Sequence, residues 1–326
     1  MHRTFLFVVA AVLIAACSGN SAVTGSGPDV PSTTTTELPD APTTTDPPPT
    51  TTSPISSTTT VVSSTTTVGL DRSSAEERMQ DDLAVLVGFG VREAGSAAEG
   101  LAAAFIEETL RGLGATVEVG EVPLPDREPS VNVLAAFGEG EVHVLLGAHF
   151  DSKPPSPGAD DNGSGVVVLL EIARRLAETS PDGRRVTLAF FGAEEFLVGV
   201  DGNAHHFGSR LLAEQLAARG DLPDLMASVD MVGVGEDLLA VTYLDSDVAA
   251  AELMAEAAAQ QGVTVTIESR GDISDHEAFA RQGVPSVFLW RPDNPQYHLA
   301  GDREVRPAAL LEDLGILEIF LESAGR

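Results

Sequence analysis

The segment Val142–Gly147 constrains the fold most, because it is apolar on both faces of an extended strand. Val144, Leu145 and Leu146 follow one another there, and successive side chains of a strand point to opposite faces of the sheet. A strand buried on both faces is typical of a parallel sheet that helices cover on each side. The sequence therefore predicts a central strand at this position.

The chain around this strand alternates between apolar extended runs and amphipathic helical runs. This alternation is typical of an α/β protein, and we predict a three-layer sandwich with a mixed, largely parallel central sheet flanked by helices. After a first helix capped by Ser73 or Ser74, the expected helices cover 97–113, 165–177, 211–218, 248–261, 275–282 and 308–323. The other expected strands cover 115–122, 131–137, 186–191, 225–232, 239–244, 263–267 and 284–290.

Residues 1–17 have the pattern of a secretory signal, with a basic start, an apolar run over 5–14 and small residues before Cys17. The segment Ile14-Ala15-Ala16-Cys17 resembles a bacterial lipobox, whose cysteine is lipidated. We therefore expect an extracytoplasmic protein that contacts the cell membrane only through a lipid on Cys17. The alternative is an ordinary signal peptide with a chance cysteine. Because Cys17 is the only cysteine, a disulfide within the chain is excluded.

Residues 18–72 consist mainly of Ser, Thr and Pro and contain few large apolar side chains. Such a segment buries too little surface to offset the entropy cost of ordering, so we expect a disordered linker. The folded domain then covers 73–326. The whole chain has a formal net charge of −30, which repels phosphate backbones, so we expect no nucleic-acid partner.

Polar residues lie near or beyond the carboxyl ends of four of the predicted strands. In an α/β fold, ligands bind at the carboxyl ends of the strands, so we expect these side chains to meet at one edge of the sheet. The four segments contribute His149 with Asp151, Glu194 with Glu195, Asp230, and Tyr297 with His298.

Each segment can be explained either by a catalytic or metal-binding role or by an ordinary structural role. Asp151 lies two residues after His149 and is positioned to orient it, although a surface pair would look the same. Of the two adjacent glutamates, one can bind a metal ion while the other serves as a general base. Asp161 lies in a glycine-rich loop that opens a helix, where a carboxylate can bridge two cations or simply cap the helix. Asp230 lies among apolar residues and needs a cation or backbone amides as partners.

Taken together, five segments resemble the M28 family of co-catalytic zinc peptidases, in its aminopeptidase group. The order and spacing of the segments match across about 150 residues, and the general layout matches over the whole predicted domain. The segments are HFDSKPPSPGADDNGSG (149–165), FFGAEE (190–195), VDMVG (229–233), SDHEAFARQGVPSV (274–287) and YHLAGD (297–302).

The resemblance implies an aminopeptidase with a peptide substrate and two Zn²⁺ ions. It implies that His149 and Asp230 hold one ion, that Glu195 and His298 hold the other, and that Asp161 bridges them. Two histidines and three carboxylates are ligands suited to zinc.

The resemblance also implies roles for the neighbouring residues. Glu194 would be the general base, and Asp151 would orient the ligands without binding a metal ion itself. Tyr297 resembles a tyrosine that polarises the scissile carbonyl in some members, and Asp275 and His276 match a segment that lines the site.

The resemblance also implies a cis peptide bond between Asp161 and Asn162. The chain departs from the family after Glu195, where 196–207 is a small insertion, and we interpret His205 and His206 within it as part of a solvated loop rather than as a third metal site.

Two other functions stay open at this point. A glutaminyl cyclase has a related scaffold but a single zinc ion, whereas five candidate ligands favour two ions. A catalytically silent domain that binds peptide or cell-wall material is the second alternative, but such relatives usually lose ligands and none is lost here.

Overall fold

The computed structural model describes residues 75–197, 199–200 and 204–325, so the signal and linker predicted for residues 1–72 lie outside the described residues. The strands are β1 Thr116–Val122, β2 Ser130–Phe137, β3 Val142–His149, β4 Arg184–Phe191, β5 Leu225–Val229, β6 Leu238–Tyr243, β7 Val265–Arg270 and β8 Ser286–Trp290. The helices are α1 Ala75–Gly88, α2 Ala97–Gly112, α3 Gly165–Glu178, α4 Phe207–Arg219, α5 Ala249–Gln260, α6 His276–Ala280 and α7 Pro307–Ser323, with a short π-type turn at Ala159–Ser164.

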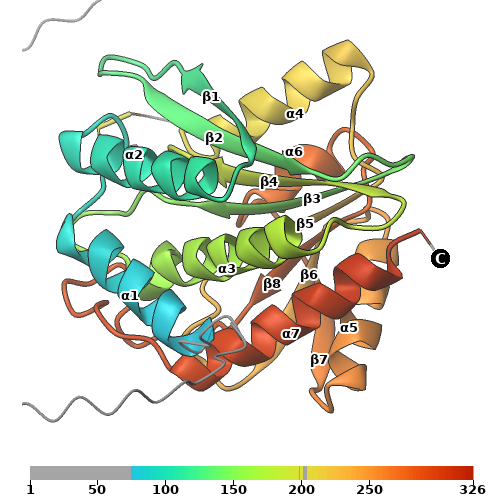
Figure 1. Cartoon of the computed structure of the whole chain (residues 1–326). Helices are drawn as coiled ribbons and strands as arrows, with labels where there is room; N and C mark the ends of the chain where they lie inside the picture. The colour runs from blue at the N-terminus through green and yellow to red at the C-terminus, as the bar shows by residue number, and fades with distance from the viewer. Residues whose placement is uncertain (1–74, 198, 201–203, 326) are drawn as a thin grey trace, which may run out of the picture. The chain divides into compact units, whose positions relative to one another are not determined.

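The eight strands form one sheet in the order β1-β2-β4-β3-β5-β8-β6-β7 (Figure 1). The four central strands β4, β3, β5 and β8 run parallel to one another, whereas β2 is antiparallel to β4 and β6 is antiparallel to β8. The prediction of a mixed, largely parallel sheet is therefore confirmed.

The central strands send alternate side chains into two separate apolar cores. In β3, Val144 and Leu146 pack with α1, α2, α3, α5 and α7, while Leu145 packs with α4 and α6 on the opposite face. Figure 1 shows α3 and α7 in front of the sheet and α4 beyond it. Helices therefore cover both faces, as the apolar run Val142–Gly147 predicts.

Most element boundaries lie within two residues of the sequence prediction, and three elements differ by three or more residues at one end. Helix α4 begins at Phe207 instead of 211, because the Phe207 amide donates to Ala193 O (2.9 Å) and ties the first turn to the end of β4. Strand β5 ends at Val229 instead of 232. Strand β7 covers 265–270 instead of 263–267, because Val263 still donates to Ala258 O (3.0 Å) at the end of α5.

In the part of the chain that the structure describes, no helix is long and apolar enough to cross a membrane.

Candidate functional site

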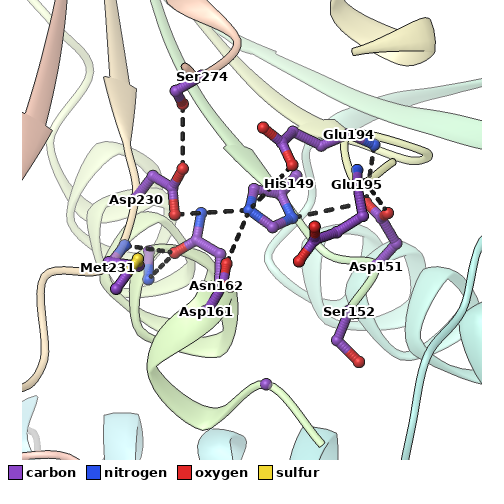
Figure 2. Close-up of polar contacts among 12 residues, drawn as sticks. His149, Asp151, Ser152, Asp161, Asn162, Glu194, Glu195, Asp230, Met231 and Ser274 are labelled. Atoms are coloured by element: carbon purple, nitrogen blue, oxygen red, sulfur yellow. Dashed lines mark hydrogen bonds and ion pairs between the residues drawn. The ribbon is translucent and has the colours of Figure 1, made fainter. Parts of the chain in front are cut away.

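The carboxyl ends of the parallel strands bring the predicted polar residues together at one edge of the sheet (Figure 2). His149 is the last residue of β3 and lies beside Phe191, the last residue of β4. Glu194 and Glu195 follow β4, and Asp230 follows β5 directly. Parallel pairing therefore places residues that are 81 positions apart, such as His149 and Asp230, within contact distance.

Asp161 lies between the two histidines and belongs to both halves of the site. His149 Nε2 is 3.4 Å from Asp161 Oδ1 and 3.4 Å from Asp230 Oδ1. His298 Nε2 is 3.1 Å from Asp161 Oδ2 and 3.2 Å from Glu195 Oε1. The five side chains thus form two clusters of three that share Asp161, and in each cluster the ligand atoms lie within 4.8 Å of one another.

Three carboxylate oxygens in these clusters are buried, accept no well-directed hydrogen bond from any described residue, and face only a histidine nitrogen at 3.1–3.4 Å. They are Asp161 Oδ2, Glu195 Oε1 and Asp230 Oδ1. A buried carboxylate without a partner is costly, so these oxygens call for cations. The residues present therefore fit a pair of divalent metal ions, and two imidazoles with three carboxylates suit zinc.

The electrostatics of the site lead to the same conclusion. Burial raises the pKa of Glu195 to about 8, and the neighbouring Asp161 carboxylate adds to the rise. Burial would lower the pKa of His149, but the Glu194 and Asp230 carboxylates raise it well above its ordinary value. Both shifts favour the protonated forms of Glu195 and His149 when no metal is present, and metal ions would replace those protons, whereas the two histidines lower the pKa of Asp161 despite its burial.

Asp151 connects two of the strand ends. Its Oδ1 accepts the Glu194 amide (3.0 Å) and its Oδ2 accepts the Glu195 amide (3.1 Å), while Oδ1 lies 3.5 Å from His149 Nδ1. Figure 2 shows Asp151 on the side of His149 that faces away from Asp161. Asp151 is fully buried, so it is placed to orient the imidazole and to fix the glutamate pair.

The loop that carries Asp161 is fixed by the residue after it. Asn162 Nδ2 donates to Val229 O (2.9 Å), and Asn162 Oδ1 accepts the Gly165 amide (2.9 Å), which joins the loop to the end of β5 and the start of α3. The peptide bond between Asp161 and Asn162 is cis, so the expectation from the resemblance is confirmed.

Two supporting residues were not identified from the sequence. Arg92, in the connection between α1 and α2, is fully buried and donates to backbone carbonyls of Phe150, Pro157 and Gly158. Nothing near Arg92 in the sequence indicates this role. Asp302, in the segment YHLAGD, accepts the backbone amides of residues 160 (3.0 Å) and 161 (3.2 Å), and its place in that segment was the available signal.

The two remaining predicted site residues, Tyr297 and His276, lie in different surroundings. Tyr297 is half-exposed and stacks on His298, with ring centroids 3.7 Å apart. His276 is fully buried beside Phe288 (5.7 Å between centroids), and its ring nitrogens have no hydrogen-bond partner among the described residues. Its side chain is therefore not among those that line the cavity next to the clusters.

The interpretation of His205 and His206 as a solvated loop is wrong. Their exposed fractions are 3% and 2%. His205 stacks on Phe196, with centroids 4.2 Å apart, and His206 Nε2 lies 2.8 Å from Glu194 Oε1. A pair of adjacent histidines looks solvent-facing in sequence, but carboxylates from distant segments give His206 buried partners.

A cavity of about 220 Å³ opens beside the two clusters. Its lining includes four acidic residues of the site and His298. The rest of the lining is mainly apolar and consists of Met231, Ile273, Phe288, Trp290, Pro292 and Tyr297, together with Arg270. The cavity therefore combines an apolar lining with the side chains that could hold metal ions.

Comparison with known proteins gives a consistent family assignment. The model of peptidase family M28 matches residues 132–309, which is more than half of the chain. Aminopeptidase YwaD of Bacillus subtilis is 32% identical over 169 residues, which are 49% of this chain and 35% of that relative. The probable lipoprotein aminopeptidase LpqL of Mycobacterium tuberculosis is 51% identical over 57 residues, 17% of this chain and 11% of that relative. The chain thus spans only about a third of YwaD and a tenth of LpqL.

Solved structures share the fold at lower identity. The zinc aminopeptidase BSAP from Bacillus subtilis has a TM-score of 0.68 at 18% identity, covering 76% of this chain and 94% of that one. A glutaminyl cyclase from Bacteroides thetaiotaomicron has a TM-score of 0.66 at 21% identity, covering 76% and 97%. The fold therefore occurs with either activity, whereas the sequence match identifies the family: this chain belongs to peptidase family M28.

Proposed function

We propose that the protein is an aminopeptidase that binds two zinc ions and hydrolyses the N-terminal peptide bond of its substrates. The observation that supports this most strongly is the pair of clusters sharing Asp161, with three buried carboxylate oxygens that accept no hydrogen bond from the described residues. The activities named for YwaD and LpqL support the same function.

Each cluster would hold one ion. His149 and Asp230 would bind the first and Glu195 and His298 the second, with one oxygen of Asp161 directed to each. Zinc ions at such a site supply Lewis-acid chemistry, since they lower the pKa of water and polarise a carbonyl.

Glu194 would be the general base. It belongs to neither cluster, and its Oε2 lies 3.9 Å from His149 Nε2, so this oxygen faces the ligands without being one of them. Glu194 would accept a proton from the attacking water at Oε2 and then donate it to the amine that leaves.

The lining of the cavity favours substrates whose N-terminal residue has an apolar side chain. The acidic residues of the lining would attract a free amine, and the apolar residues would receive the side chain. A pocket below about 300 Å³ is smaller than those for drug-sized ligands, which suits a single residue. Tyr297, stacked on His298 at the rim, would contact the scissile carbonyl.

A terminal carboxylate finds less support as the recognised group. Arg270 is the one arginine on the described cavity wall, and its Nε already donates to Glu268 (2.8 Å). A carboxypeptidase would need a free cation in that position.

We also propose that the protein is extracytoplasmic and that a lipid on Cys17 anchors it to the membrane. The proposal includes a signal at 1–17, a linker at 18–72 and a peptidase domain at 73–326. The word lipoprotein in the name of LpqL supports it. Cys17→Ser should move the protein from the membrane fraction to the medium, and unchanged membrane association would contradict the anchor.

The function is tested with the purified protein and a small set of substrates. Leucine p-nitroanilide should be hydrolysed, its N-acetyl derivative should not, and removal of metal by a chelator should abolish the activity until zinc is added back. Cyclisation of an N-terminal glutamine without hydrolysis of leucine p-nitroanilide would establish a glutaminyl cyclase instead. Hydrolysis of leucine p-nitroanilide that survives complete metal removal would refute the proposal.

A further inference from the structure

His206 has carboxylates at both of its ring nitrogens. Nε2 lies 2.8 Å from Glu194 Oε1, and Nδ1 lies 3.1 Å from Glu277 Oε2. With an exposed fraction of 2%, the ring is shielded from water, which strengthens both contacts. His206 is therefore the middle member of a buried chain of charged groups that ends at Glu194.

The far end of this chain is fixed by arginines. Glu277, at the start of α6, accepts a hydrogen bond from Arg210 Nη2 (3.0 Å) and pairs with Arg281. Arg210 also pairs with Asp272 (3.2 Å), so cationic groups already satisfy the carboxylates behind His206. This arrangement favours a hydrogen-bonded support over a third metal ion at His205, His206 and Asp272.

The backbone holds His206 in the same place. Its amide donates to Glu194 O (2.8 Å), and the next amide, that of Phe207, donates to Ala193 O (2.9 Å). His206 itself has a φ of 55°, a left-handed conformation that costs energy for a residue with a side chain. The segment Ala193-Glu194 after β4 and the segment His206-Phe207 at the start of α4 are thus joined at two points, and the ring contacts Glu194.

These contacts leave the two oxygens of Glu194 in different surroundings. Oε1 is bound to His206, while Oε2 lies 3.9 Å from His149 Nε2 on the side of the metal clusters. A carboxylate beside two metal ions could otherwise turn and bind one of them. With Oε1 restrained, only Oε2 is presented to the reaction.

We propose that His206 is a positioning residue that holds Glu194 as the general base and keeps it from binding metal, and this inference rests on the proposed function. His206 keeps both of its protons throughout. The proton taken from water resides on Glu194 Oε2 and leaves from there to the amine, while Nε2–H of His206 donates to Oε1 before and after the transfer.

The first experiment compares three variants of the full protein with the wild type at saturating zinc. His206→Ala should lower kcat by about 10–100-fold, the usual effect of losing a residue that supports a catalytic group, with KM and zinc content unchanged. His206→Gln retains a donor near Glu194 and should recover most of the loss. A merely structural role would lower stability without this separation of kcat from KM and without recovery in the glutamine variant.

His143→Ala is the matched control. His143 is also buried and also contacts partners through both ring nitrogens, Thr187 (2.9 Å) and Arg185 (2.9 Å), but it lies at the opposite end of β3 from His149. Its loss should reduce stability and leave kcat unchanged. Equal losses of kcat in His206→Ala and His143→Ala would overturn the proposal.

Crystal structures of the wild type and His206→Ala with zinc bound provide a readout that does not depend on activity. The Glu194 carboxylate should keep its place in the wild type and should turn toward a zinc ion or adopt several conformations in the variant. If Glu194 stays in place in the variant, His206 does not position it. If the wild type hydrolyses no peptide, the proposed function fails, but the position of Glu194 still decides the role of His206.

Discussion

Arg92 offers the sharpest test of how the candidate site is supported, because its side chain is fully buried and acts only through backbone carbonyls. Its Nε donates to Phe150 O (2.7 Å), its Nη2 donates to Gly158 O (3.0 Å), and its Nη1 donates to Pro157 O. These carbonyls lie between His149 and Asp161 in the sequence. Burial lowers the pKa of Arg92 to about 10, so the guanidinium is still charged at neutral pH.

The substitution Arg92→Met keeps much of the volume and removes all of the donors. Each buried carbonyl left without a partner costs about 1–3 kcal/mol. The substitution also removes the cost of burying the guanidinium charge, which offsets part of this loss. We therefore expect the free energy of unfolding to fall by about 3–5 kcal/mol, as it does when other buried charge contacts are broken.

Glycine at position 158 makes the loop sensitive to this loss. Gly158 has a φ of 63°, and a Cβ there would lie 2.3 Å from Asp161 O and 3.0 Å from Arg92 Nη2. The loop is therefore packed closely around the guanidinium and cannot easily replace it with water. Zinc affinity should fall together with stability, because His149 and Asp161 are joined by this loop.

The assay is urea denaturation followed by circular dichroism in excess zinc, with Arg111→Met as the control. Among the described residues, the Arg111 side chain pairs with Glu107 alone (2.6 Å) on α2, and it is 59% exposed. Its loss should change the free energy of unfolding by less than about 1 kcal/mol. Equal effects of the two substitutions would refute the reasoning about Arg92.

Three further predictions follow from other contacts. Glu194→Gln should lower kcat by about 10²–10⁴-fold with zinc content unchanged, measured by kinetics and atomic absorption, and loss of zinc would show that Glu194 is a ligand instead. Asp302→Ala frees the amides of Asp160 and Asp161, so zinc affinity measured by competition with a chromogenic chelator should fall about 10–100-fold, and unchanged affinity would contradict the support role. Burial raises the pKa of Glu99 to about 8, above its unfolded value, so its contribution to stability is present at acidic pH and is lost as pH rises toward 8. Glu99→Gln should therefore become more stable relative to the wild type, by more than about 1 kcal/mol, between pH 5 and 8 in urea denaturation, and a constant difference would contradict this pKa.

The parts of the site that the sequence predicts are those whose signal is local. His149 ends the apolar strand β3 and Asp230 follows the apolar strand β5 directly, so the strand pattern alone predicts that they meet at one edge. The spacing of the M28-like segments then groups them with Asp161, Glu195 and His298. The structure brings these five side chains together, and their roles as ligands remain proposals.

The parts that the sequence did not predict depend on partners far away in the chain. Arg92 contacts carbonyls that lie 58 to 66 residues later, and no pattern around it indicates those partners. His206 looks solvent-facing beside His205, but Glu277, 71 residues later, and Glu194 bury it. The contacts of His206 follow from the packing of α4 against α6, which is settled only in three dimensions.

The number and positions of the bound metal ions test the central proposal most directly. A crystal of the zinc-loaded protein, measured at wavelengths on both sides of the zinc absorption edge, should show two anomalous peaks per chain. One should lie between His149 and Asp230 and the other between Glu195 and His298, with Asp161 in contact with both. A single peak, or two peaks that do not share Asp161, would contradict the two-zinc site.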